Sequence, residues 1–583
     1  MYRFIGALSV LALSTATLAQ TSAPQPKAAA PTPAPASGGT AAAKPDPAIL
    51  NTRLAAPLPA DQAAMKAHVL FLASDAMKGR EAGSPEYDIA AQYVAAQFYA
   101  AGLRPAGEAG GYLQQVPLVT YQAAGEGSMV WTGQGGKGQK NGGQPGKPVP
   151  LAFGKDYVPA ANPARAETAV SAPVVFVGDG IVAPQYGHDS YKDIDARGRI
   201  VAYFRGAPSR FAGEERAFFG SPATKLAIAA KHGAIGAIEL AAPTTTPEAM
   251  TRMATGYDRG RMQWANADGT AGTDTPGTPL LGTLGPAGAA QLFAGAPVTW
   301  AAVTAEAAKP APTYRSVALP GTLTVATRTA FTPARSSNVV GIVPGADPAV
   351  GKEVVVLSAH LDHIGVNASG DGDRINNGAL DNAIGIASLI EEAKRFTASG
   401  KPPRRTVMFL AVTAEEKGLV GADYFAHHPT VPRANIVADV NLDMPMLLYR
   451  FEDMIVFGAD RSTLGPIVAR AAAAAGTTMS PDANPEQGFF VRSDHFRFVQ
   501  QGIPSVFLWP GQKGAGKAAV EGFLSTCYHR PCDDLSLPIM WDQGVRFVDV
   551  NYRIAREIAD GAQRPVWNKG DYFGTTFKGP MAK

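Results

Sequence analysis

The stretch VVVLSAHLDH, residues 354–363, joins a run of apolar residues to a cluster of polar ones. Val354–Ala359 is almost entirely apolar, which is typical of a strand in a parallel sheet that helices cover on both faces. His360, Asp362 and His363 follow directly after it. In open α/β sheets, ligands bind beyond the carboxyl ends of the strands. The stretch therefore predicts an α/β domain with a functional site at this strand end.

Three further apolar runs predict neighbouring strands, at Thr406–Val412, Ile436–Leu442 and Ser505–Trp509. Between the first strand and these, apolar residues recur with helical spacing from Ala383 to Phe396. Similar patterns predict helices within 61–104 and over 417–427, 462–475 and 541–560. Strands that alternate with helices in this way indicate a mixed sheet between two helical layers, an α/β/α architecture.

Acidic and imidazole side chains stand at the ends of these strands. Glu415 and Glu416 follow the second strand, Asp443 follows the third, and Ser493-Asp494-His495 precedes the fourth, while Asp381 begins a helix after an Asn/Gly-rich turn. Each has an ordinary structural explanation when taken alone, such as a helix N-cap or a solvated helix start. Together on one edge of a sheet, however, imidazoles and carboxylates suit a borderline divalent cation, zinc foremost.

The N-terminal region differs in composition from the rest of the chain. Residues 1–19 have the features of a secretory signal, with Arg3 before a short apolar run and Thr17-Leu18-Ala19 as a cleavage site. An Ala/Pro-rich linker over 20–56 follows. The apolar run is too short to span a bilayer, and no later stretch is long enough. We therefore expect an exported protein, periplasmic or secreted, without a membrane span.

A second module interrupts the α/β pattern. Residues 118–312 contain short strand patterns, for example Pro173–Val177 and Arg199–Arg205, and within them 243–300 is rich in Thr, Gly and Ala. They predict a β-rich insertion. The expected organisation is a signal at 1–19, a linker at 20–56, the two parts of the α/β domain at 57–117 and 313–568, the insertion at 118–312 and a C-terminal tail at 569–583.

Charge and cysteine content exclude other classes of protein. The 52 Lys and Arg residues nearly balance 49 Asp and Glu, giving a formal net charge of +3, whereas nucleic-acid binding needs a concentrated basic surface. Two cysteines in 583 residues exclude a fold held together by disulfides. Cys527 and Cys532 lie close together, and both a small loop-bracing disulfide and two buried free thiols remain open.

The polar motifs together resemble a known enzyme family. The stretches SAHLDHIG, NNGALDNAIG, FLAVTAEEKGLVGADYF, NLDM and RSDHFRF resemble, in order and spacing, the co-catalytic double-zinc aminopeptidases of metallopeptidase family 28. The segment VVFVGDGIVAPQYGHDSYKDIDARGRIVAYFRG is similar to the protease-associated domain inserted in secreted members. The resemblance covers about residues 57–560, except that 243–300 matches nothing we can assign and Asn382 departs from the motif after Asp381.

The resemblance implies a site with two zinc ions per chain. One ion is expected on His360, Asp381 and Asp443, and the other on Asp381, Glu416 and His495, with Asp381 bridging both. Two metal ions a few ångströms apart need such a shared anionic ligand. Asp362 is expected to hold His360 from behind and fix its tautomer. Glu415 is implied to be the general base that moves a proton from the attacking water to the leaving amine.

The segment CYHRPCD, residues 527–533, also resembles secreted members of the family. It implies a disulfide between Cys527 and Cys532 and a role for the Tyr528 hydroxyl as hydrogen-bond donor to the tetrahedral oxyanion. His529 beside it is expected to face the substrate. Phe489 and Phe490 are candidates for the pocket that receives the first side chain of the substrate, although core packing explains either of them equally well.

The favoured function is a zinc-dependent aminopeptidase that removes N-terminal residues from peptides with a free amino group. A carboxypeptidase, a dipeptidase or a glutaminyl cyclase on the same fold is the alternative. A carboxypeptidase needs cations that face a free carboxylate, and Arg492, Arg497 and Arg530 are the candidates. A non-enzymatic binding protein is the third possibility, and the complete ligand set argues against it.

Overall fold

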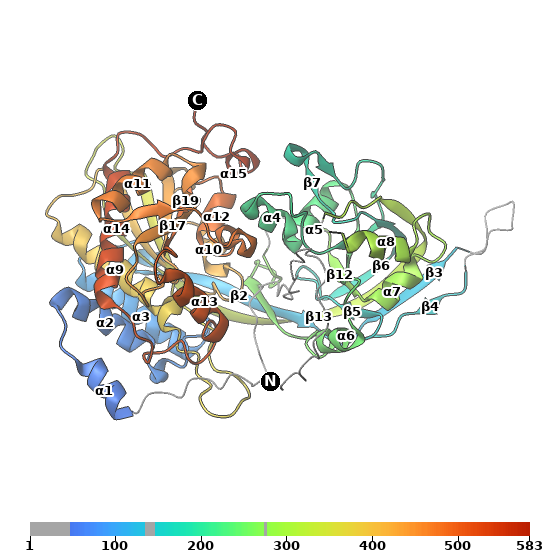
Figure 1. The fold of residues 1–583 in the computed structure, drawn as a ribbon, viewed down its shortest axis with the longest axis horizontal. Helices are drawn as coiled ribbons and strands as arrows, with labels where there is room; N and C mark the ends of the chain where they lie inside the picture. Colours follow the sequence, from blue (N-terminus) through green and yellow to red (C-terminus); the bar gives the residue numbers. More distant parts are fainter. Residues whose placement is uncertain (1–46, 135–145, 273–276, 310) are drawn as a thin grey trace, which may run out of the picture.

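The computed structural model describes residues 47–134, 146–272, 277–309 and 311–583, which form two lobes (Figure 1). The expected signal at 1–19 and most of the expected linker lie outside the described residues. Strands β2 (Leu113–Ala123) and β13 (Val317–Val343) lead from one lobe toward the other. We call the part formed by residues 47–123 and 329–583 the α/β lobe, and the segment between them the inserted lobe.

The α/β lobe is built on a mixed sheet with strand order β2-β13-β15-β14-β16-β19-β17-β18, and β11, which comes from the segment of the inserted lobe, pairs with β2. β14 lies parallel to β15 and β16, and β16 lies parallel to β19. These four are the strands that the sequence predicts, and the prediction of a mixed α/β fold is confirmed. The bounds are β11 Arg261–Trp264, β14 Val354–His360, β15 Thr406–Val412, β16 Ile436–Asn441, β17 Asp453–Phe457, β18 Thr478–Ser480 and β19 Ser505–Pro510.

Helices cover both faces of this sheet because its central strands are apolar on both sides. Val355 and Leu357 of β14 belong to one core with α2, α3, α9, α11 and α14, whereas Val354 and Val356 pack with α10 and α12 on the opposite face. The bounds are α1 Pro47–Ala55, α2 Ala60–Leu72, α3 Pro85–Ala100, α9 Ile384–Ala398, α10 Val420–His427, α11 Leu464–Ala474, α12 His495–Gln500, α13 Gly516–Thr526, α14 Trp541–Asp560 and α15 Tyr572–Thr576.

The inserted lobe is mixed α/β rather than mainly β. Its sheet runs β4-β3-β13-β6-β9-β10-β12-β5, with β6, β9, β10 and β12 parallel. The strands are β3 Ser128–Gly133, β4 Val149–Pro150, β5 Tyr157–Pro159, β6 Glu167–Phe176, β9 Ile200–Phe204, β10 Gly236–Leu240 and β12 Leu280–Leu284, and the helices are α4 Gly213–Gly220, α5 Pro222–Lys231, α6 Pro247–Ala254, α7 Pro286–Leu292 and α8 Trp300–Ala307. The remaining strands are short: β1 Arg104–Pro105 in the α/β lobe, and β7 Val182–Ala183 and β8 His188–Asp189 in the inserted lobe.

The lobes divide at places that differ from the expected boundaries. β2 continues past residue 118 to Ala123, and β13 pairs with β2 and β15 in one sheet and with β3 and β6 in the other, so β13 crosses between the two sheets. The end of the expected linker forms helix α1, where Pro47 opens the helix and Arg53 donates to the carbonyl oxygens of Leu535 and Ser536. The expected tail also packs, because Phe573 in α15 is fully buried.

Helix α4 of the inserted lobe docks on the α/β lobe. The Phe218 ring makes edge contacts with the rings of Phe496, Phe573 and Phe577. Arg461 of the α/β lobe donates to the Glu214 carboxylate and lies over the Phe573 ring. This apolar and ionic contact fixes α4 next to the segment before α12. Within the described part of the chain, no helix has the length and apolar character that crossing a bilayer requires.

We expect the fold to depend on the apolar layer beneath the sheet. Phe409 of β15 is fully buried and contacts Phe98 and Phe396. Phe409→Ala should lower the free energy of unfolding of the α/β lobe by about 3–5 kcal/mol, since it leaves a cavity that the neighbours fill only in part. Urea unfolding followed by circular dichroism measures this. Tyr99→Ala, at a side chain that is 76% exposed, is the matched control, and equal losses in both variants would contradict the packing described.

Candidate active site

The parallel strands bring their polar residues to one edge of the sheet. His360 is the last residue of β14 and lies opposite Val412, the last residue of β15. Glu415 and Glu416 follow β15, and Asp443 follows β16 after Leu442. The η4 turn, Ala379–Ala383, places Asp381 beside them. The site predicted from the strand ends thus forms at the carboxyl edge.

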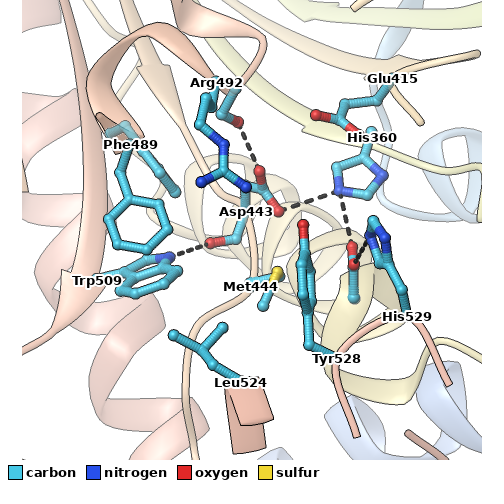
Figure 2. A pocket seen from close by; sticks show the side chains of 13 residues that line it. His360, Glu415, Asp443, Met444, Phe489, Arg492, Trp509, Leu524, Tyr528 and His529 are labelled. Carbon is cyan, nitrogen blue, oxygen red and sulfur yellow. Dashed lines mark hydrogen bonds and ion pairs between the residues drawn. The ribbon is translucent and has the colours of Figure 1, made fainter. Parts of the chain in front are cut away.

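Asp381 lies at the centre of the site, and each of its oxygens faces a different histidine. His360 Nε2 lies 3.2 Å from Asp381 Oδ1 and 3.0 Å from Asp443 Oδ1. On the other side, His529 Nε2 lies 3.2 Å from Asp381 Oδ2 and 3.0 Å from Glu416 Oε2. Figure 2 shows the His360 and His529 rings on the same side of the pocket. One carboxylate therefore joins two groups of metal-ligand atoms.

His363 adds a further imidazole to the second group. Its Nδ1 lies 2.7 Å from Glu416 Oε1 and 3.9 Å from Asp381 Oδ2, and its ring contacts the His529 ring. His363, Asp381 and Glu416 have ligand atoms within 4.8 Å of one another, as do His360, Asp381 and Asp443. Sequence reasoning noted His363 after the first strand but gave it no role.

The contacts decide how these groups ionise. Burial opposes ionisation of Asp381, but the hydrogen bond from His360 and the charge of His363 outweigh it and hold the pKa of this carboxyl well below its usual range. Burial likewise opposes ionisation of Glu416, yet the charge of His529 lowers its pKa to about 2. Burial lowers and the Glu416 carboxylate raises the pKa of His529, to about 10. The carboxylates are therefore anionic at neutral pH and attract cations.

The structure does not place His495, a predicted metal ligand, beside the other predicted ligands. His495 begins α12, and its ring packs against the rings of Phe490 and Phe507 at 5.2 and 5.3 Å between centroids. It belongs to neither group of metal-ligand atoms among the described residues. Burial lowers its pKa to about 3, which keeps the ring neutral in its apolar surroundings. His529 occupies the place that His495 was expected to fill.

The Ser-Asp-His stretch contributes to the site through its serine instead. Ser493 Oγ donates to Asp443 Oδ2 at 2.6 Å and accepts from Asn441 Nδ2. The Trp509 indole donates to the backbone oxygen of Asp443 at 2.9 Å. These bonds fix the Asp443 carboxylate, whose other oxygen faces His360.

The Asp362 side chain contacts the backbone of Glu415 and Glu416 rather than the His360 ring. Its carboxylate accepts from the backbone N–H of Glu415 at 3.0 Å and lies near that of Glu416. His360 Nδ1 instead lies 3.1 Å from the backbone oxygen of Asp362. Residue 362 thus orients the imidazole through its main chain and fixes the position of Glu415 through its side chain.

The Glu415 side chain lines the pocket next to His360 (Figure 2). Burial and the neighbouring Glu416, Asp443 and Asp494 carboxyls raise its pKa well above the usual range, against the opposing charge of His360. The preceding residue, Ala414, has φ 54°, a left-handed conformation that costs free energy in a non-glycine residue. The surroundings of Glu415 therefore differ from those of Glu416, whose carboxylate faces His363 and His529.

The loop after α13 supplies Tyr528 and His529. Cys527 and Cys532 form a disulfide that closes this loop, so the alternative of two free thiols is excluded. The Tyr528 ring stacks on the His529 ring at 3.9 Å, and Figure 2 shows its hydroxyl directed into the pocket. Burial and the Asp381 and Glu416 charges raise the pKa of Tyr528 well above its usual range, so the hydroxyl keeps its proton.

Two buried residues that sequence reasoning missed hold the loops of the site. The Asp533 carboxylate accepts from the backbone N–H groups of Leu380 and Asp381 at 2.8 and 3.0 Å. The Arg80 guanidinium, fully buried, donates to the backbone oxygens of Leu72, Leu361, Asn377 and Gly378. Asp533 follows the quoted cysteine loop and was visible there, whereas nothing in the sequence around Arg80 indicates four carbonyl partners.

An open pocket lies beside these groups. Besides the polar residues already described, its wall consists of Met444, Phe489, Arg492, Phe507, Trp509 and Leu524 (Figure 2). Phe489 thus lines this pocket, with its ring 4.8 Å from that of Trp509. Phe490 does not line the pocket, because it is fully buried against His495 and Phe573.

Comparison with known proteins identifies this region. Residues 338–555 match the model of peptidase family M28. The chain is 30% identical over 211 residues to leupeptin-inactivating enzyme 1 of Streptomyces exfoliatus, covering 34% of this chain and 43% of that protein. It is 36% identical over 80 residues to a vacuolar membrane protease of Verticillium alfalfae, covering 14% and 7%. The chain therefore spans less than half the length of these curated relatives.

Solved structures of similar outline include bacterial aminopeptidases. The aminopeptidase from Aneurinibacillus sp. strain AM-1 aligns with 20% identity and a TM-score of 0.45, covering 85% of this chain and 93% of that one. The zinc aminopeptidase BSAP from Bacillus subtilis aligns with 17% identity and a TM-score of 0.40, covering 87% and 98%.

Substitution of His529 and of His495 tests directly which histidine binds the metal. His529→Gln should weaken zinc binding at least about tenfold, since it removes a group that faces two carboxylates. His495→Phe should leave zinc binding unchanged, because an aromatic ring fits the surroundings of this neutral side chain. Titration against a chromophoric chelator measures both. Weaker binding in His495→Phe with normal binding in His529→Gln would restore the assignment made from the sequence.

Proposed function

Residues 338–555 match the model of peptidase family M28, and on that premise we propose that the chain is a zinc-dependent aminopeptidase with two zinc ions per chain. The observation that carries the proposal is the shared Asp381 carboxylate, with one oxygen toward His360 and the other toward His529. Two cations bound close together need one anionic ligand in common.

The donors present suit zinc. Imidazole nitrogens and carboxylate oxygens are the ligands that zinc takes in catalytic sites, where three protein ligands leave a position open. His360, Asp381 and Asp443 would hold the first ion, and Asp381, Glu416 and His529 the second, with His363 against Glu416. Three buried carboxylates in one site also need positive charge to balance them. Bound zinc supplies an acidified water and polarises the scissile carbonyl.

Glu415 is proposed as the general base. Its carboxylate lines the pocket beside His360 but belongs to neither ligand group among the described residues. It is therefore available to accept a proton from the attacking water and to pass that proton to the leaving amine. Burial and the neighbouring Glu416, Asp443 and Asp494 carboxyls raise the pKa of Glu415, so this side chain takes up a proton more readily than an ordinary carboxylate does.

Tyr528 is proposed to stabilise the oxyanion of the tetrahedral intermediate. The hydroxyl keeps its proton and points into the pocket next to the His529 ring. A donor that is already in position when negative charge develops stabilises the transition state more than the ground state. The disulfide between Cys527 and Cys532 braces the loop that holds it.

The pocket favours release of single residues over cleavage within a chain. Its free volume is about 40 Å³, and Phe489, Trp509 and Leu524 enclose it (Figure 2). We infer that this small apolar wall receives a single substrate side chain. The carboxyl groups beside it, those of Asp381, Glu415 and Asp443, suit the ammonium group of a free N-terminus. The substrate proposed is therefore a peptide with a free amino group.

Two further parts of the proposal concern the rest of the chain. Export rests on the signal features of residues 1–19 and on the disulfide, which persists in oxidising compartments. The inserted lobe is proposed to be a protease-associated domain, on the resemblance of the segment that contains β7, β8 and β9. Its helix α4 packs beside the segment that carries Phe489, where it would limit access by long substrates.

The function is tested with aminoacyl reporter substrates. Hydrolysis should stop after removal of zinc by a chelator and return when zinc is restored, because the proposed site provides no other means of activating water. Peptides with a blocked N-terminus should resist cleavage, and peptides with a blocked C-terminus should be cleaved. Cleavage restricted to N-blocked peptides would replace the aminopeptidase by a carboxypeptidase.

A conservative substitution separates the base from the ligands. Glu415→Gln should keep its zinc content and lower kcat by about 10²–10⁴-fold, since it removes the proton acceptor and keeps the shape of the side chain. Steady-state kinetics and metal analysis of the same sample give both values. Asp371→Asn, in an exposed loop, is the control. Full activity of Glu415→Gln would refute the proposed mechanism.

A further inference from the structure

We infer that Arg492 is an anchor for a substrate carboxylate in the pocket, so that substrates carrying a carboxylate near the scissile bond are preferred. The inference rests on the proposed function and extends it from peptides in general to an acidic class. The carboxylate has two chemical sources: the side chain of an N-terminal Asp or Glu, or the C-terminal carboxylate of a dipeptide.

The first argument is the position of the guanidinium. Arg492 lines the pocket together with Phe489, Trp509 and Tyr528. Its guanidinium carbon lies 5.4 Å from the centre of the Phe489 ring, and Figure 2 shows the group directed into the pocket rather than away from it. Of the two other cations considered from the sequence, Arg497 faces the Asp423 carboxylate and donates to the Gly418 oxygen, and neither Arg497 nor Arg530 is among the residues that line this pocket.

The second argument is that Arg492 forms no ion pair with an acidic side chain that the structure describes. Its one hydrogen bond, from Nη1 to the backbone oxygen of Gln487, spans 3.1 Å, and in the described part of the chain no carboxylate lies within ion-pair distance of it. A guanidinium has five N–H donors in a planar fork that fits a carboxylate in a bidentate manner. Most of these donors therefore remain available to a ligand.

The third argument is the cost of leaving this cation without a partner. A neutral substrate side chain would cover the guanidinium with apolar groups and remove water from it, which is unfavourable for an unpaired charge. The substrate ammonium would also repel it. A substrate carboxylate satisfies the free N–H donors, so binding discriminates in favour of anionic substrates and against neutral ones of the same shape.

The fourth argument is that the segment carrying Arg492 is held from both sides. Gly488 has φ 62°, and a Cβ on it would lie 2.5 Å from Ala217 Cβ of α4. A Cβ on Gly213 would lie 2.7 Å from Pro485 Cβ. Together with the ion pair between Arg461 and Glu214, these close approaches fix the segment against the inserted lobe. A guanidinium that is already held in one place loses less conformational entropy when it binds its ligand than one on a free loop.

The test compares matched substrates on the full, zinc-loaded chain. Glu- and Gln-4-nitroanilides differ only in the side-chain carboxylate, and Ala-Ala and Ala-Ala-amide differ only in the C-terminal one. We expect kcat/KM to favour the anionic member of one pair by about tenfold or more, the size of a charge-assisted hydrogen bond. Arg492→Gln should abolish this ratio and change kcat/KM for the neutral member less than threefold. Arg492→Lys should retain part of it, and Arg530→Gln all of it.

A binding measurement keeps this test independent of turnover. L-glutamate should bind the zinc-loaded protein more tightly than L-glutamine by calorimetry if the side chain is the source, and Ala-Ala should bind Glu415→Gln more tightly than Ala-Ala-amide if the C-terminus is. Equal ratios in wild type and Arg492→Gln would overturn the inference and leave the peptidase intact. Absence of hydrolysis of every substrate, with the binding preference present and lost in Arg492→Gln, would overturn the proposed function and support the anchor.

Discussion

The site depends on one carboxylate that serves two neighbours at once. Asp381 faces His360 with one oxygen and His529 with the other, and each histidine also faces a second carboxylate, Asp443 or Glu416. The arrangement concentrates negative charge that only cations can balance. The surrounding structure then serves to keep this carboxylate in place, since a shift of either oxygen would separate the two groups.

Main-chain hydrogen bonds provide most of that support. Asp533 accepts a hydrogen bond from the backbone of Asp381, and Asp362 accepts one from the backbone of Glu415. Arg80 donates to the carbonyl oxygens of Leu361 and Asn377. These residues come from the cysteine loop, from the end of β14 and from the N-terminal helices. The site is thus assembled from parts that lie far apart in sequence, and the α/β core holds them together.

The sequence was sufficient to predict the central strands and the acidic residues at their ends. Long apolar runs fix buried strands, and parallel strands must deliver their carboxyl ends to one edge. It was not sufficient to choose between His495 and His529, because both stand beside polar residues that suit a metal site. Only tertiary packing shows that His495 turns into an aromatic layer. The 27-residue strand β13 was missed too, since its Ala, Thr and Ser residues carry little hydrophobic pattern.

The most direct test of this account is the position of the metal ions. A crystal structure of the zinc-loaded protein, with anomalous diffraction measured at the zinc edge, locates them without reference to activity. We expect two peaks, one on each side of the Asp381 carboxylate, the first next to His360 and Asp443 and the second next to Glu416 and His529. A single peak, or a second peak at His495, would contradict the shared-carboxylate site.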